Sequence, residues 1–172
     1  LFISKGFSQE FSGMFSIDLN KKSKIYSSID KNESNVILCF SSNENTQAIL
    51  LDENTNLINL ISTKSFPNYS KIITEYTSNK KTKFVWANDD LTSFLVQSFD
   101  FNNNETYSKV YSFYNKDKKL LQVFFNNDEL QILAISSIDK NISITSISND
   151  GSKSENAIRA ENSALNTLNN LY

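Results

Sequence analysis

Short runs of apolar, β-branched and aromatic residues alternate along the chain with clusters of asparagine, aspartate, serine and lysine. Runs of this kind, bounded by turn-forming residues, are typical of β-strands. The chain has three glycines and one proline, so asparagine and aspartate supply the turns, because they tolerate left-handed backbone geometry. We predict strands at residues 11–19, 23–30, 35–41, 46–51, 57–62, 71–77, 82–87, 91–100, 107–114, 119–125, 129–137 and 141–148.

Several of these strands are separated by short polar turns. Hairpins are predicted over residues 16–28, 49–62, 73–86, 111–124 and 135–148. Short links join antiparallel neighbours, whereas parallel strands need a crossover of roughly a dozen residues. A long meander must also protect its edges. The pattern therefore predicts an all-β fold, an antiparallel meander that closes as a barrel or stacks as a two-layer sandwich.

A propeller-type architecture is the alternative. Residues 110–151, VYSFYNKDKKLLQVFFNNDELQILAISSIDKNISITSISNDG, resemble a WD-type β-propeller blade running into the next one. The segment covers about a quarter of the chain and lacks the Gly-His and Trp-Asp dipeptides of that family. The resemblance implies four-stranded antiparallel blades in place of the barrel or sandwich.

Residues 152–172 have a different pattern from the β domain predicted over residues 1–151. Ser152 stands three residues before Glu155, which is the spacing of a capping box. Apolar residues then recur at helical spacing, which predicts an amphipathic α-helix. We expect this helix to pack on the β domain or to dock into a protein partner. The candidate partner-binding stripe consists of Ala157, Ala160, Ala164, Leu165, Leu168 and Leu171.

Composition excludes more chemistry than it indicates. A chain of 172 residues with 39% hydrophobic residues is long enough for one domain with a sizeable core. The net charge is −2 and Arg159 is the one arginine, which argues against nucleic-acid binding. The chain has no histidine, which excludes Ser-His-Asp and Cys-His catalysis and His-ligated zinc. We therefore expect no catalytic residues, no metal ligands and no cofactor.

The remaining features set limits on the chemistry and location of the protein. Cys39 lies within the apolar run 36–40 and is expected to be a buried, unreactive core thiol. A single cysteine leaves the redox compartment open. No apolar run approaches the ~20 residues that a membrane span needs. The chain starts at Leu1 rather than methionine, so we expect a processed mature protein or an excised fragment.

One loop partly matches a calcium site. Asp100, Asn102 and Asn104 match the opening of a calcium-binding loop, in which alternate oxygens converge on one ion. Glu105 then occupies the glycine position, and Tyr111 occupies the position of the bidentate glutamate. The sequence therefore predicts an ordinary hairpin loop.

The segment KFVWANDDLTSF, residues 83–94, places the single tryptophan near two carboxylates. Strand alternation puts Phe84 and Trp86 on one face, which makes them the candidate ligand-binding residues at the core or at its rim. Asp89 and Asp90 follow at a predicted turn. Glycoside hydrolysis needs two carboxylates about 5–10 Å apart across the sugar, and adjacent turn residues are poorly placed for that.

These observations favour a non-catalytic binding or scaffold module that is a subunit of a larger protein assembly, with a protein as its partner. The alternative is a carrier that holds an apolar or lipid-like small molecule inside a β-barrel. A carboxylate-dependent glycan hydrolase that uses Asp89 or Asp90 is a third hypothesis. The sequence assigns no compartment and identifies no ligand.

Overall fold

The computed structural model describes residues 24–30, 34–113, 117–126 and 128–158, and the regular secondary structure of these residues consists of β-strands. Strands β1–β11 begin and end within two residues of the strands predicted from residue 23 onwards. The strand predicted at 11–19 lies outside the described residues. The strands are β1 (Lys24–Asp30), β2 (Asn35–Ser41), β3 (Asn45–Leu51), β4 (Leu57–Lys64), β5 (Lys71–Ser78), β6 (Lys81–Ala87), β7 (Ser93–Asp100), β8 (Glu105–Ser112), β9 (Lys118–Asn126), β10 (Glu129–Ser136), β11 (Ile142–Ile147) and β12 (Lys153–Ile158).

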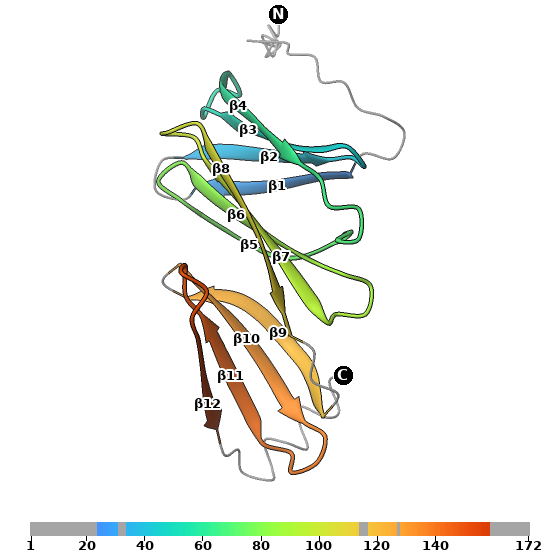
Figure 1. The fold of residues 1–172 in the computed structure, drawn as a ribbon. Helices are drawn as coiled ribbons and strands as arrows, with labels where there is room; N and C mark the ends of the chain where they lie inside the picture. Colours follow the sequence, from blue (N-terminus) through green and yellow to red (C-terminus); the bar gives the residue numbers. More distant parts are fainter. Residues whose placement is uncertain (1–23, 31–33, 114–116, 127, 159–172) are drawn as a thin grey trace, which may run out of the picture. The chain divides into compact units, whose positions relative to one another are not determined.

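The strands form three four-stranded antiparallel sheets, β1–β4, β5–β8 and β9–β12, each built from consecutive strands (Figure 1). Each sheet keeps its own two edge strands, so the strands that the structure describes do not close into the predicted barrel. The link after β4 carries Pro67, which has no N–H group to continue a ladder. The hairpin predicted over residues 111–124 is also wrong, because β8 and β9 belong to different sheets.

The chain divides into two compact units. Unit 1 comprises residues 1–65, 77–81 and 99–106, and unit 2 comprises residues 66–76, 82–98 and 107–172. The chain therefore passes between the units several times.

In unit 1, apolar side chains are buried on one face of the β1–β4 sheet. Ile37, Cys39, Ala48 and Leu50 are buried on this face, so Cys39 is buried as predicted. Polar contacts join the same face to the end of β5 and to two turns of unit 1. Ser28 Oγ lies 2.7 Å from Thr77 Oγ1 of β5. The Lys80 amide donates to Asp30 Oδ2 at 2.9 Å, and Asn59 Nδ2 donates to the Phe101 carbonyl at 3.2 Å.

The core of unit 2 combines side chains from two sheets. Strands β6–β8 contribute Val85, Ala87, Phe94, Val96 and Tyr111, and strands β9–β11 contribute Val123, Leu130, Ile132 and Ile147. Core residues on one strand are two positions apart, as in Val85 and Ala87 of β6 or Leu130 and Ile132 of β10. This spacing follows from the alternation of side chains between the two faces of a strand. Two apolar sheet faces thus cover each other within this unit.

The helix predicted over residues 152–172 is wrong where the structure describes it, because Lys153–Ile158 form strand β12, which pairs with β11. The expected capping box does not form. Glu155 makes an ion pair with Lys118, and the Ser152 amide donates to Asp150 Oδ1 at 2.8 Å. Pairing with the β11 edge outweighs a weak helix preference. Residues 159–172 lie outside the described residues. Within the described part of the chain, no helix is long and apolar enough to cross a membrane.

The two-residue turn between β5 and β6 makes a prediction about stability. Asn79 and Lys80 have φ values of 53° and 56°, which is the geometry of a type I′ turn that favours Asn-Gly. We expect Lys80→Gly to raise the free energy of unfolding by about 0.5 kcal/mol, because glycine adopts this conformation without the penalty of a Cβ. Urea denaturation measures the change. Lys119→Gly within β9 is the control and should lower stability; a destabilised Lys80→Gly variant would contradict the turn assignment.

Candidate functional site

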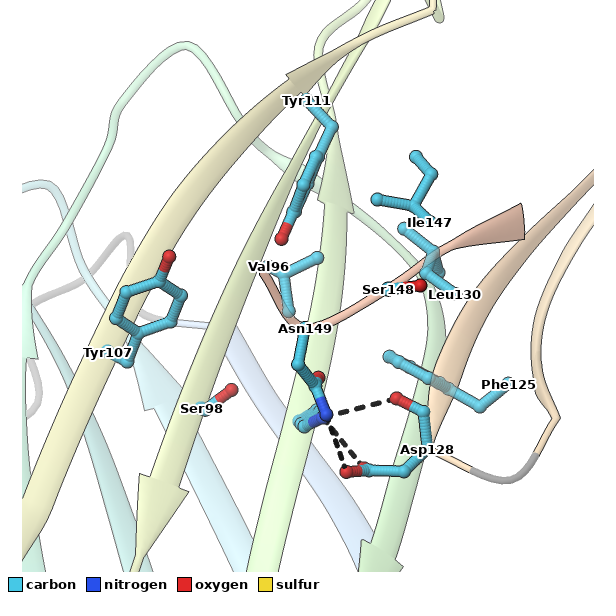
Figure 2. Close-up of a pocket in the computed structure, with 11 residues that line it drawn as sticks. Val96, Ser98, Tyr107, Tyr111, Phe125, Asp128, Leu130, Ile147, Ser148 and Asn149 are labelled. Atoms are coloured by element: carbon cyan, nitrogen blue, oxygen red, sulfur yellow. Dashed lines mark hydrogen bonds and ion pairs between the residues drawn. The ribbon is translucent and has the colours of Figure 1, made fainter. Parts of the chain in front are cut away.

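Unit 2 contains a pocket of about 370 Å³ in which apolar and polar side chains meet (Figure 2). The inner face of strands β6–β8 forms one wall, and strands β9–β11 with their turns form the other. The pocket is lined by Lys83, Val96, Ser98, Tyr107, Tyr111, Phe125, Asp128, Leu130, Ile147, Ser148 and Asn149.

Lys83 joins strand β6 to two separate turns at the polar end of the pocket. Its Nζ lies 2.7 Å from Asp128 Oδ1 and also donates to the Asp128 carbonyl at 3.3 Å and to Asn149 Oδ1 at 3.0 Å. Asn149 Nδ2 donates in turn to Asp128 Oδ2 at 3.2 Å. The β9–β10 turn and the β11–β12 turn are therefore held together over one ammonium group, whose three N–H donors match the three oxygen acceptors.

The β11–β12 turn has a backbone geometry that depends on glycine. Gly151 has a φ of 91°, and a Cβ at this position would collide with the Lys109 side chain. Lys109 Nζ donates to the Asp150 carbonyl at 3.0 Å and lies 5.3 Å from the centre of the Tyr111 ring. The turn that presents Asn149 is thus fixed to strand β8 as well as to Lys83.

Tyr111 contributes a neutral hydroxyl group to the pocket. Burial raises the pKa of Tyr111 above its ordinary value, and the nearby Tyr107 and Asp150 raise it further. The hydroxyl therefore stays protonated at neutral pH and can donate a hydrogen bond. In Figure 2 the hydroxyl groups of Tyr107, Tyr111 and Ser98 point into the same space.

The predicted ligand-binding residues, Phe84 and Trp86, do not line this pocket. Both side chains are fully buried, and their ring centroids lie 6.3 Å apart. Alternation along β6 places them on the face opposite to Lys83 and Val85. The indole of Trp86 thus lies in a packed interior; a ligand-binding role for the two residues stays a prediction.

The acid pair after β6 lies in a hairpin turn, as the sequence predicts. Asn88 accepts backbone hydrogen bonds from Thr92 and Ser93 at 2.9 and 3.0 Å through its side-chain oxygen, which closes the turn. Asp89 is exposed and lies 3.9 Å from Lys71 Nζ. Neither Asp89 nor Asp90 lines the pocket. The hydrolase hypothesis therefore gains no support from their position.

The calcium-like loop is an ordinary hairpin loop between β7 and β8. Asp100 Oδ1 accepts from the Asn102 amide at 3.0 Å, and Oδ2 accepts from Asn103 Nδ2 at 3.0 Å. Lys81 Nζ lies 2.7 Å from Asp100 Oδ2. The carboxylate is thus directed at groups of its own turn and at a lysine, rather than at a shared ion.

The structure describes one residue of the predicted partner-binding stripe. Ala157 is exposed on the edge strand β12, opposite Ser143 of β11. The other five members, from Ala160 to Leu171, lie outside the described residues, so the role of the stripe stays a prediction.

A second candidate surface lies on the β1–β4 sheet, on the face opposite to the one described for unit 1. We call it the β1–β4 face, and the strand registers define it by three cross-strand rows. These rows are Ile25–Phe40–Gln47–Ser62, Ser27–Leu38–Ile49–Leu60 and Ile29–Val36–Leu51–Leu57. No residue in the three rows is charged. Phe40, Ile49 and Leu51 are buried at its centre, while Ile25 and Ile29 on the edge strand β1 are 58% and 61% exposed.

Comparison with known proteins assigns no family. No protein-family model matches the chain. No curated protein matches it either. Among solved structures, the chain is similar to a crystal structure of a protein from Lactobacillus plantarum, with a TM-score of 0.49 and 9% sequence identity. The match covers 81% of this chain and 42% of that one, so the chain spans less than half the length of the matched protein.

Two lysines on β6 provide a matched test of the contacts around Lys83. Lys83–Asp128 and Lys81–Asp100 are both 2.7 Å ion pairs, but the lysine side chains are 16% and 56% exposed. We expect Lys83→Met to lower the free energy of unfolding by about 1–3 kcal/mol, because two turns lose a shared, partly buried donor. Lys81→Met should cost less than about 1 kcal/mol. Thermal or urea denaturation measures both. Equal losses would contradict the joining role of Lys83.

Proposed function

We propose that the chain is a non-catalytic binding module and a subunit of a larger protein assembly, and that a β-sheet of the partner covers the β1–β4 face. The observation that carries this proposal is the exposure of Ile25 and Ile29 at the edge of an uncharged and largely apolar sheet face. Exposed apolar patches of this kind mark protein interaction sites, because their burial releases ordered water.

The chemistry of the partner surface follows from the face itself. Leu57 and Leu60 on β4 are also exposed, so apolar side chains border the face on both edge strands. Its polar members, Ser27, Gln47 and Ser62, carry no charge. A charged partner surface would be desolvated there without a counter-charge. The face therefore suits a flat, apolar and uncharged surface.

A second β-sheet is the partner that this architecture favours. In unit 2 the apolar face of one four-stranded sheet is covered by the apolar face of another. Sheets pack in this way about 10 Å apart with interdigitating side chains. We propose the same packing for the β1–β4 face, with the second sheet supplied by another protein chain.

We further propose that the three sheets are propeller-type blades. Support comes from the chain-order meander of four strands in each sheet, which is the strand pattern of a blade. Propellers typically contain about four to eight blades. An additional sheet would then be needed to complete the array, and the β1–β4 face would be one of the surfaces that it covers.

The carrier hypothesis receives less support. It requires a closed barrel, and the strands that the structure describes form three separate sheets. An apolar molecule would therefore lack the enclosed interior that the hypothesis assumes.

The proposal predicts that charge on the β1–β4 face prevents assembly. We expect the double variant Ile25→Lys/Ile29→Lys to lose the complex that the wild-type chain forms in its source organism, measured by native mass spectrometry of the purified protein. Binding should weaken at least about tenfold, because two ammonium groups would be buried without partners. Both positions are exposed, so the variant should keep the wild-type circular dichroism spectrum.

Ile138→Lys is the matched control, because Ile138 is 76% exposed in the β10–β11 turn and lies outside the β1–β4 face. This variant should keep the complex. An unchanged complex in the double variant, or a wild-type chain that is monomeric, would overturn the proposal. A complex of two identical chains that the double variant loses would identify the partner as a second copy.

A further inference from the structure

The size of the pocket in unit 2 limits what it can hold. Its volume of about 370 Å³ lies near the lower end of the range for small-molecule sites, about 300–1,000 Å³. A ligand of one ring or a short chain fits such a volume. The pocket lies in unit 2 and shares no residue with the β1–β4 face.

The two charged side chains that line the pocket neutralise each other. Lys83 and Asp128 are its two charged lining residues, and they form an ion pair with each other. The Lys83 donors are directed at Asp128 and Asn149. An anionic or cationic ligand would have to leave water without gaining a counter-charge, which costs several kcal/mol. The pocket therefore favours a neutral ligand.

Both walls of the pocket combine apolar and polar groups. Val96, Leu130, Ile147 and Phe125 supply apolar surface. Figure 2 shows the hydroxyl groups of Ser98, Tyr107 and Tyr111 on the β7 and β8 wall. A purely apolar ligand would cut these hydroxyl groups off from water without replacing their hydrogen bonds. A ligand that carries both hydroxyl groups and C–H faces satisfies both kinds of lining group.

We propose that this pocket binds a neutral polyhydroxylated ring, the chemistry of a hexose, either as a free sugar or at the end of a glycan. Tyr107 is 51% exposed and offers its ring as a stacking surface, since an aromatic ring has a large apolar face. The Asp128 carboxylate has lone pairs beyond those directed at Lys83 and Asn149, and accepts from a sugar hydroxyl. The protonated Tyr111 hydroxyl donates to a sugar oxygen.

The polar groups are fixed before the ligand arrives. Asp128 and Asn149 hydrogen-bond to each other and to Lys83. The Asn149 turn is closed by bonds from the Gly151 amide to the Ser148 carbonyl at 2.8 Å and from the Ser148 amide to the Ser152 carbonyl at 3.0 Å. A site fixed in this way loses little conformational entropy when it binds.

Titration of the full chain with glucose, galactose and mannose, followed by two-dimensional amide NMR, tests the proposal. We expect saturable shifts at Asp128, Asn149 and Tyr107 for at least one of these sugars, with a Kd of about 1 mM or lower. Glucosamine and glucuronate should bind at least about tenfold more weakly at pH 7, because each would bury an unpaired charge. Absence of saturable shifts with all three neutral sugars, or equal binding of glucuronate, would overturn the proposal.

Methyl glycosides of the sugar that binds distinguish the two sources. Equal affinity for the methyl glycoside identifies the pocket as a site for the end of a glycan, because the anomeric oxygen then tolerates a substituent. Loss of binding identifies a free sugar as the ligand.

Variants separate the pocket from the general stability of the fold. Tyr107→Ala should weaken sugar binding by about tenfold or more through loss of the stacking surface, and Asp128→Asn should weaken it through loss of a charged acceptor. Val110→Ala is the control, because Val110 lies on the same strand but outside the pocket lining, and it should leave the Kd unchanged. Unchanged binding in the folded Tyr107→Ala variant would contradict the site.

Discussion

Unit 2 depends on the packing of one apolar sheet face against another. Val85, Phe94 and Val96 of β6 and β7 share one core with Leu130, Ile132 and Ile147 of β10 and β11. Sheet strands alternate their side chains between two faces, so burying one face of each sheet directs every second residue into this core. The contact also positions the pocket, because Val96, Leu130 and Ile147 belong to both.

The polar end of the pocket follows from the same packing. Lys83 stands two residues before Val85 on β6 and therefore lies on the core-facing side, close to the turns that carry Asp128 and Asn149. An ammonium group in this position needs acceptors, and the two turns supply them. The result is a rigid and electrically neutral wall beside an apolar one. These properties account for the neutral, amphipathic ligand that we propose, and for the joining role of Lys83.

The β1–β4 face is buried at its centre and exposed along its edge strands. Its central residues, Phe40, Ile49 and Leu51, are buried, while apolar side chains on both edge strands remain exposed. An apolar sheet face gains stability by being covered. The proposed assembly extends to this face the sheet-on-sheet packing that unit 2 already shows.

The strands could be predicted because their signal is local. Alternation and asparagine-rich turns lie within a few residues, and β1–β11 follow them closely. Pairing is not local. The preference of residues 153–158 for an edge of β11 overrides a helical pattern, and the break between β8 and β9 has no equivalent in the hairpin pattern.

The residues of the pocket could not be predicted from local sequence patterns either. Its residues come from six strands, β6 to β11, and from two distant turns. Aspartate or asparagine in such a turn resembles any other turn residue. One signal was available. Lys83 lies on the opposite face of β6 from Trp86, so the aromatic pair and the polar group could not belong to one site.

Methyl–methyl nuclear Overhauser effects in the full chain test the packing of the two sheets in unit 2. We expect cross-peaks between Val96 of β7 and the methyl groups of Leu130 and Ile147, because all three residues share one core and line one pocket. Absence of these cross-peaks in a folded protein whose β10–β11 hairpin contacts are present would contradict the packing of the two sheets, and with it the pocket.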